Sequence, residues 1–190
     1  KMKDFVLLAL LTALYIIVYF VAMMIISLMG PFGHAISPGV CGLLSGAILI
    51  FISRKIGKMW QFTLMELIIM GVFALMGAGY LPWFITSMIG AVLADVIAST
   101  SNKPSVLKVA IASGLIHVGN ALGGIIPACF FAEQYMNEWI ARGQKPDQML
   151  EMVKATQGVM GILGTVITFV LSVIGVYIGY SILKGHLKEN

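Results

Sequence analysis

Residues 5–29 read FVLLALLTALYIIVYFVAMMIISLM, an apolar run without a charged side chain. At about 1.5 Å of rise per residue, a helix of this length exceeds the ~30 Å hydrocarbon core of a bilayer and can span it with some tilt. Lys1 and Lys3 precede the run and no basic residue directly follows it. This distribution places the N-terminal end of the helix in the cytoplasm. The run therefore predicts a membrane helix whose direction fixes that of every later segment.

The composition indicates the same class for the whole chain. Of its 190 residues, 59% are hydrophobic and 11% charged, and the mean hydropathy is +0.99. The apolar runs are unbroken, whereas strands of a membrane barrel would alternate over stretches of about 10 residues. The net charge of +4 comes from basic residues at helix ends without interleaved aromatics, which argues against nucleic acid as a partner. We expect an all-α integral membrane protein.

Six apolar segments predict a single domain over residues 1–190, a compact bundle of six transmembrane helices. The segments are residues 5–29, 35–52, 59–76, 81–98, 107–131 and 158–183. With six helices, the basic residues outside the last long loop all fall on one side of the membrane: Lys1, Lys3, Arg54, Lys55, Lys58, Lys103, Lys108, Lys184 and Lys188. Basic loops face the cytoplasm, so both termini are expected there.

The longest connection, residues 132–157, is then an outer loop. Pro146 and Asp147 are typical of a helix start, and Met149 and Val153 follow at helical spacing. A loop of this length is more often functional than idle. We expect it to be partly helical and to lie across the outer mouth as a lid.

Polar residues within the predicted spans are the first candidates for ligand binding, because such residues are costly in a membrane. In the fifth helix, Ser113, His117 and Asn120 follow at i, i+4 and i+7 and share one face. Thr165 and Thr168 belong to a similar stripe in the sixth helix. Two facing stripes would line a small cavity. The alternative is that these side chains bond to their own helix carbonyls or to neighbouring helices and tighten the bundle.

Further candidate ligand contacts lie toward the outer ends of the helices and in the outer loops: His34, Tyr80, Trp83, Ser87, Tyr135 and Asn137. Trp83, with Ser87 one turn deeper, fits a pocket wall. Tyr80 fits an interfacial aromatic belt equally well, and His34 a solvated loop. The outer half of the spans carries no Lys or Arg. A strongly anionic ligand is therefore disfavoured, and a pyridine or pyrimidine ring fits the residue types better.

Two carboxyl groups lie in the predicted inner half of the spans. Asp95 comes late in its helix and Lys108 early in the next, which predicts an interhelical ion pair. Glu66 has no obvious partner, so a proton relay, a partner contact and a satisfied structural role all stay open. Cys41 and Cys129 are interpreted as packing residues, with a disulfide as the alternative.

Motifs for catalysis are missing. The sequence holds no G-x-x-x-x-G-K-[ST] phosphate loop, no H-E-x-x-H and no cysteine pair at zinc spacing. It also lacks the G-x-S-x-G nucleophile elbow. We expect no enzymatic activity, no bound metal and no cofactor.

The first helix also carries Ala9 and Ala13 in the segment LALLTAL, spaced A-x-x-x-A after a basic start. With six helices, the short outer loop GAGYLPW at 77–83 and the long fifth loop, the chain resembles the substrate-binding S components of energy-coupling factor (ECF) transporters, in particular the MptD and Trep_Strep-like group. The resemblance implies capture of a vitamin-like molecule, such as pyridoxine or hydroxymethylpyrimidine, at the outer face of a prokaryotic plasma membrane. It also implies that Ala9 and Ala13 dock on a transmembrane T subunit attached to two ATPases.

Two other functions remain open from the residues. A self-sufficient secondary carrier would use Glu66 or Asp95 as a proton relay, although no inverted repeat or broken helix is visible. A purely structural membrane subunit would use the polar stripes for packing alone.

Overall fold

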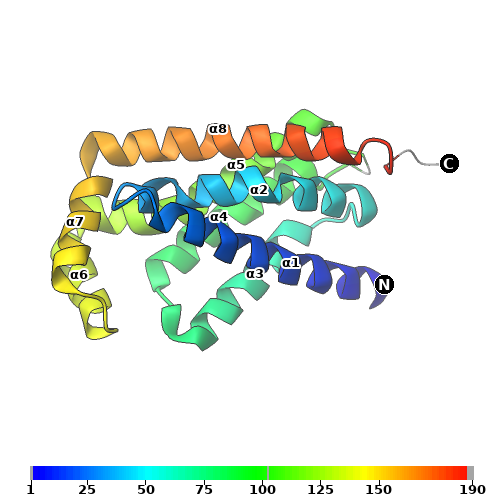
Figure 1. Ribbon diagram of the computed structural model, residues 1–190. Coiled ribbons are helices and arrows are strands. Elements are labelled where there is room, and N and C mark those ends of the chain that lie inside the picture. The colour runs from blue at the N-terminus through cyan, green and yellow to red at the C-terminus, as the bar shows by residue number, and fades with distance from the viewer. Residues whose placement is uncertain (1, 102, 188–190) are drawn as a thin grey trace.

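The structure is a computed structural model that describes residues 2–101 and 103–187, and within these ranges it contains helices but no strand (Figure 1). Among the described residues, six helical spans are long and apolar enough to cross a membrane. They are α1 (Met2–Ser27), α2 (Gly33–Lys55), α3 (Gln61–Phe73) continued by the π-helical turn η1 (Ala74–Ala78), α4 (Leu81–Ala98), α5 (Val106–Phe130) and α8 (Gly158–Leu183). The all-α fold with six membrane helices is confirmed.

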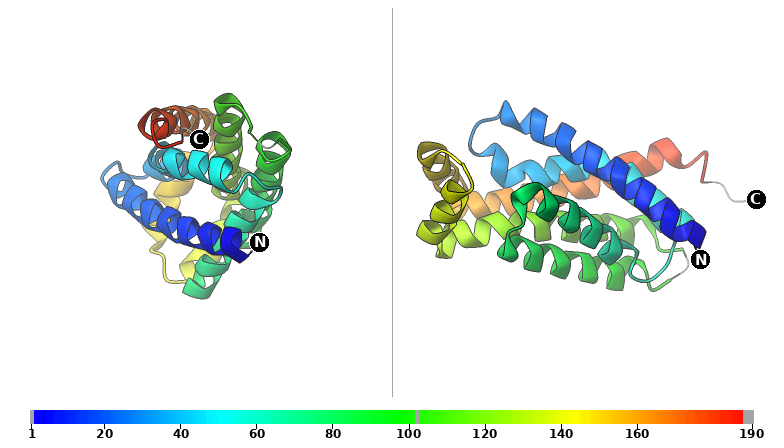
Figure 2. Two further views of the ribbon diagram at one scale, coloured as in Figure 1. Left: turned by 90° about the vertical axis from the view of Figure 1, so that its right-hand side faces the viewer. Right: turned by 90° about the horizontal axis from the view of Figure 1, so that it is seen from below.

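Two short helices, α6 (Ala132–Ala141) and α7 (Pro146–Thr156), form a hairpin at one end of the bundle (Figures 1 and 2). The start of α1 and the end of α8 lie together at the opposite end. We call these the hairpin end and the termini end. The helix predicted to begin at Pro146 is confirmed, and it buries Met149 and Val153.

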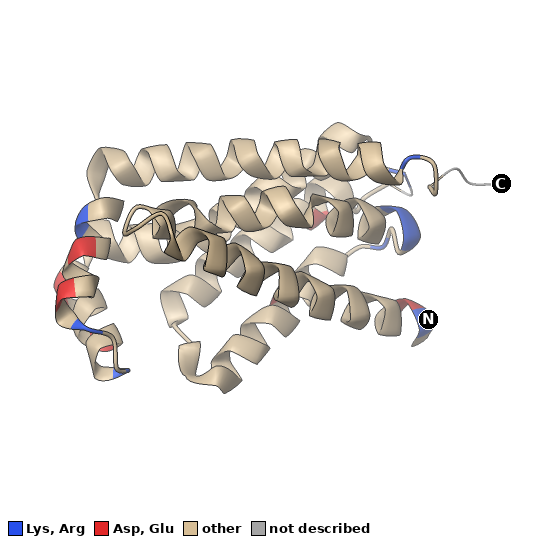
Figure 3. Cartoon of the chain, viewed as in Figure 1, with Lys and Arg blue, Asp and Glu red and all other residues tan. Residues whose placement is uncertain are grey.

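Charged residues gather at the two ends of the bundle (Figure 3). The hairpin carries both signs, whereas the termini end is mainly basic. This distribution agrees with cytoplasmic termini, which stay a prediction. Two of its basic residues, Lys1 and Lys188, lie outside the described residues. At the termini end, the loop after α2 is tied to the start of α1 by an ion pair between Lys58 and Asp4, and this hydrogen bond raises the pKa of Lys58.

Glycines bring α2 and α8 into backbone contact along a seam. A Cβ added at Gly46 would lie 2.0 Å from the backbone of Gly175, and one at Gly179 would lie 2.3 Å from the backbone nitrogen of Ala47. Small residues four apart allow helices in a membrane to approach this closely. The glycine pairs Gly42 with Gly46 and Gly175 with Gly179, each four residues apart, therefore serve packing within the bundle, and we call these contacts the glycine seam.

The helices differ in how much of their apolar surface faces protein. Within the apolar membrane-spanning stretch of each helix, 67% of α2 and 61% of α5 is buried inside the protein. These two helices therefore form the centre of the bundle. In α1 the share is 22%, the lowest of the six. The helix α1 therefore keeps a long apolar face open to lipid or to another protein.

Asp95 holds the start of α3 instead of pairing with Lys108. Its carboxylate accepts the backbone N–H groups of Phe62 and Thr63 at 3.2 and 2.8 Å. It also accepts the hydroxyls of Thr63 and Ser99, each at 2.7 Å. The predicted ion pair is wrong because the N–H groups of a helix start offer a buried carboxylate a complete set of donors. The side chain of Lys108 is exposed.

The two cysteines are free thiols. Cys41 is buried in the core, with 1% of its surface exposed. Cys129 points its sulfur at the carbonyl of Thr156 from 3.9 Å. Both positions fit the packing interpretation.

Candidate ligand-binding site

A cavity of about 680 Å³ opens at the hairpin end of the bundle. It lies among the later turns of α1, the start of α2, the start of α4, the later half of α5 and the hairpin α6–α7. Sites for small organic ligands are commonly about 300–1,000 Å³. The cavity is therefore large enough for a vitamin-sized molecule.

Aromatic rings form one wall of the cavity between α1 and α4. The ring of Phe73 lies 5.0 Å from that of Tyr19 and 5.4 Å from that of Trp83, both close to edge-on. All three residues line the cavity. Edge-to-face packing leaves ring surfaces free, and a ligand ring could stack on them.

A second aromatic group joins α4 to the hairpin. Tyr80 lies 5.5 Å from Tyr135 and 5.8 Å from Trp139, measured between ring centroids. Burial raises the pKa of Tyr135 to about 12 and also raises the pKa of Tyr80. Both hydroxyls therefore stay neutral at physiological pH and can donate or accept a hydrogen bond.

Asn120 lines the cavity with its side-chain amide, and 9% of the residue's surface is exposed. Its Oδ1 accepts a hydrogen bond from the Ser87 hydroxyl at 2.9 Å, and its Nδ2 donates to the carbonyl of Ile116 at 3.1 Å. An amide nitrogen carries two hydrogens, so one donor remains available. Ser87 is fully buried, and it fixes the orientation of Asn120 without lining the cavity.

The structure does not bring His117 to the cavity. Its imidazole has no exposed surface and lies 2.9 Å from the Tyr15 hydroxyl through Nε2. Its Nδ1 lies 2.7 Å from the carbonyl of Ser113, and a carbonyl can only accept. The proton therefore sits on Nδ1, and Tyr15 donates to Nε2. In this neutral form His117 connects α5 to α1.

The rim of the cavity is polar. His34 lies at the start of α2, and Gln148 and Glu151 lie on α7. Among the described lining residues, Glu151 is the only carboxylate, and none is Lys or Arg. A ligand in this cavity meets aromatic carbon, amides and a negative charge at the mouth.

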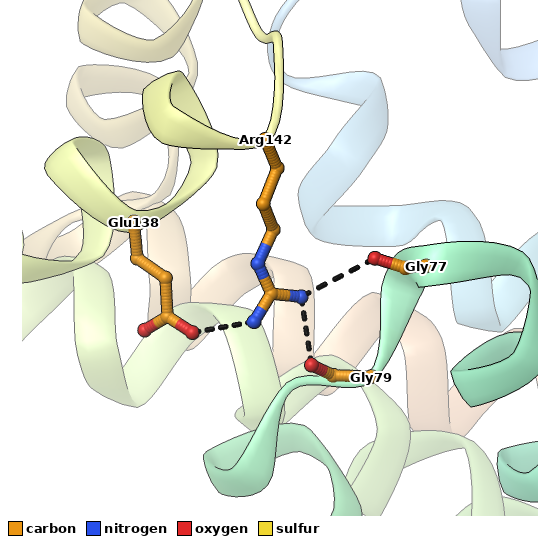
Figure 4. A network of polar contacts seen from close by, with 4 residues as sticks. All are labelled: Gly77, Gly79, Glu138 and Arg142. Atoms are coloured by element: carbon orange, nitrogen blue, oxygen red, sulfur yellow. Dashed lines mark hydrogen bonds and ion pairs between the residues drawn. The ribbon is translucent and has the colours of Figure 1, made fainter.

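Arg142 fastens the hairpin to the end of η1 and to the turn that follows it (Figure 4). Its Nη1 donates to the carbonyl of Gly79 at 2.7 Å and reaches that of Gly77 at 3.5 Å. Its Nη2 donates to Glu138 at 2.5 Å, and the guanidinium lies 5.1 Å from the Trp139 ring centroid. Gly77 adopts a left-handed backbone with φ of 84°, which turns its carbonyl toward the hairpin region. We call these contacts the Arg142 latch.

The structure divides the sequence-based candidates into two groups. Lining the cavity are His34, Tyr80, Trp83, Asn120 and Tyr135. Outside the lining are Ser87, His117, Asn137 and Thr165.

Two of the outlying candidates have a plain structural placement. Asn137 is exposed on α6, whose opposite face carries the buried Tyr135. Thr165 donates its hydroxyl to the carbonyl of Gly161 at 2.9 Å, a bond within α8.

Several lining residues were missed from the sequence. Tyr19 and Phe73 lie inside uniformly apolar runs, where no spacing separates a cavity wall from a core position. Gln148 lies in the loop predicted to be a lid, but only the structure shows that it faces the cavity.

The α1 alanines lie away from the cavity. Ala13 is exposed and Ala9 is half-buried, on the helix with the lowest buried share. Their side chains add little bulk, so another helix could approach the α1 backbone closely at this point.

A family described as hypothetical bacterial integral membrane protein (Trep_Strep) has a sequence model that matches residues 2–189. No curated protein and no solved structure matches the chain.

Proposed function

The chain belongs to the Trep_Strep family of bacterial integral membrane proteins, and on this basis we propose that it is the substrate-binding S component of an ECF-type importer. It would capture a vitamin-like small molecule and deliver it together with a transmembrane T subunit and two ATPases. Pyridoxine and hydroxymethylpyrimidine represent the favoured ligand class. The chain itself would hydrolyse no ATP, because its sequence has no phosphate loop.

The observation that carries this proposal is the cavity of about 680 Å³ covered by the α6–α7 hairpin. A binding component needs one enclosed site that opens to a single side of the membrane. The aromatic walls suit a flat ring, and the second hydrogen of Asn120 Nδ2, which is not used in the bond to Ile116, can donate to a polar substituent on that ring. If the termini are cytoplasmic, the cavity faces the outside, where an importer would meet its substrate.

The second support is α1. A helix with a large apolar face and a small-residue strip at Ala9 and Ala13 offers a docking surface for a membrane partner. That surface is separate from the cavity. Ligand binding and energy coupling should therefore be separable by mutation.

The test replaces Ala9 and Ala13 together by leucine. We expect uptake by cells that express the T subunit and the ATPases to fall at least about tenfold, because bulky side chains prevent close helix approach. Ligand binding by the purified protein should not change. The matched control introduces leucine at Gly71 of α3 and at Ala74, the first residue of η1, which are also exposed. Loss of binding in the α1 variant, or unchanged uptake, would contradict the docking role.

A proton-coupled secondary carrier is the second candidate, and the buried carboxyl of Glu66 is the observation that favours it. Such a carrier would transport substrate when reconstituted alone in liposomes with a pH gradient. An S component would bind substrate there and transport none without its partners.

A further inference from the structure

Glu66 of α3 is a carboxyl group for which the described structure shows no hydrogen-bond partner. None of its surface is exposed, and neither carboxyl oxygen has a donor within hydrogen-bond distance. An isolated carboxyl inside a membrane is costly and usually marks a functional site. The other membrane carboxyl, Asp95, has four donors. The bundle therefore gives Glu66 no set of hydrogen-bond donors like that of Asp95.

Glu66 is not among the described residues that line the cavity, but it lies on the same helix face as one that does. It shares one face of α3 with Met70 and Phe73, at i, i+4 and i+7, and Phe73 lines the cavity. Along the helix, Glu66 is about 10 Å deeper than Phe73. It lies within electrostatic range of Asn120 and Tyr19, which both line the cavity. A negative charge on Glu66 would therefore act on a ligand that lies next to these two residues.

The cavity offers favourable contacts for a cation, and its described lining residues include no basic side chain that would repel one. Among the described lining residues there is no Lys or Arg, and Glu151 adds a negative charge at the rim. The walls are rich in aromatic rings, whose faces attract cations. Arg142, whose guanidinium lies 5.1 Å from the ring centroid of the lining residue Trp139, is not itself among the described lining residues and is held by the latch.

We propose that Glu66 is the counter-charge for a cationic ligand, an organic molecule that carries a positive nitrogen on or beside an aromatic ring and binds with that nitrogen toward Asn120. Asn120 and Glu66 are then the residues that determine specificity for charge. This inference rests on the proposed function, since it names the ligand class of the same cavity. It goes further because a neutral pyridine or pyrimidine would satisfy the aromatic walls but leave Glu66 without a partner.

The experiment compares two probes of the same shape. The 1-methylpyridinium-3-carboxamide cation and 3-methylbenzamide differ only in the positive ring nitrogen. Binding is followed by tryptophan fluorescence, because Trp83 and Trp139 line the cavity. Trp60, the third tryptophan, is replaced by phenylalanine in every sample to remove its background.

We expect the protein with Glu66 to bind the cationic probe about tenfold more tightly than the neutral one. Glu66→Gln keeps the size of the side chain, and it should reduce this preference to less than about threefold while binding of the neutral probe is unchanged. Glu133→Gln is the matched control, since Glu133 is an exposed carboxylate on α6 that does not line the cavity. It should retain most of the preference.

An equal affinity for the two probes, or an unchanged preference in Glu66→Gln, overturns the inference. Failure of both probes to bind overturns it as well. If Glu66→Gln gives no folded protein, Glu66→Met decides, because it removes the charge with an apolar side chain of similar size and must likewise reduce the preference to less than about threefold. These results leave the proposed function untouched. That proposal fails separately, if the α1 leucine variant keeps full uptake.

Discussion

The termini end and the hairpin end of the bundle are built on different principles. In the middle of the bundle, α2 and α8 touch backbone to backbone, and toward the termini end Asp95 accepts three of its four hydrogen bonds from the start of α3 and the fourth from Ser99 at the end of α4. At the hairpin end, α1, α4 and α5 surround a cavity, and two short helices partly cover it, held by a small aromatic group and the Arg142 latch. The comparison indicates that the helices outside the hairpin form a rigid part, which we call the base, and that the α6–α7 hairpin over the cavity, which we call the mouth, can move. Ligand entry should therefore require movement of the hairpin alone.

The glycine seam is the strongest part of the base, so breaking it should have the largest effect. Gly46→Leu puts a side chain where a Cβ would already lie 2.0 Å from the Gly175 backbone. We expect a loss of about 3 kcal/mol or more in stability, at the upper end of overpacking. Thermal unfolding in detergent measures this loss. Gly71→Leu is the control, because a Cβ there meets nothing within 4 Å. Equal stability of the two variants would show that the seam is not tightly packed.

Removing the carboxylate of Asp95 should have the next largest effect. Asp95→Ala leaves two backbone N–H groups at the start of α3 without an acceptor. The expected cost is about 2 kcal/mol in unfolding free energy. Asp147→Ala, at the exposed first turn of α7, serves as control and should change stability by less than about 0.5 kcal/mol. Hydrogen exchange should locate the added opening in the first turn of α3, and protection that is unchanged there would contradict the cap.

The aromatic group of the mouth predicts a dependence of stability on alkaline pH. The pKa of Tyr135 is about 12 in the folded protein, above the unfolded value of about 10. Its contribution is fully present below pH 10 and is lost as the pH rises from 10 to 12, because the unfolded chain releases the proton first. For Tyr135 alone, the loss should reach about 1 kcal/mol at pH 11. Tyr135→Phe should flatten the pH profile of the unfolding midpoint over this range, and an identical profile would show that the ring is solvated.

The Arg142 latch should give the smallest effect on global stability. The Arg142 side chain is 27% exposed, so water and salt weaken its ion pair with Glu138. Arg142→Ala should destabilise the protein by about 0.5 kcal/mol or less. Its effect should instead be local, with several-fold faster hydrogen exchange in α6 and α7 and no change in α2 or α8. Lys145→Ala, which removes an exposed cation from the same loop, is the control. Faster exchange throughout the bundle would contradict an independently moving hairpin.

The sequence predicted the helices better than it predicted their contacts. Apolar runs specify membrane helices because length and hydropathy decide insertion, and the helix start at Pro146 follows from local chemistry. The acceptor role of Asp95 depends on donors more than 30 residues away in the chain, so the nearby Lys108 was the wrong partner. For His117, the polar stripe indicated a special residue, but its partner Tyr15 lies in an apolar run with no local signal. Which face of α5 meets the cavity is likewise fixed by packing between helices.

Occupancy of the cavity is measured most directly by denaturing the purified protein and quantifying the released small molecules by mass spectrometry. The comparison uses Gly124→Phe, which fills the cavity, since a Cβ there meets only the Tyr135 hydroxyl at 3.4 Å. Gly71→Phe makes the same change on the exposed surface of α3. We predict one organic molecule at near-equal amount from the native protein and from Gly71→Phe, and its absence from Gly124→Phe. Equal release from all three proteins, or none from the native protein after candidate ligands are added back, would contradict a binding site in this cavity.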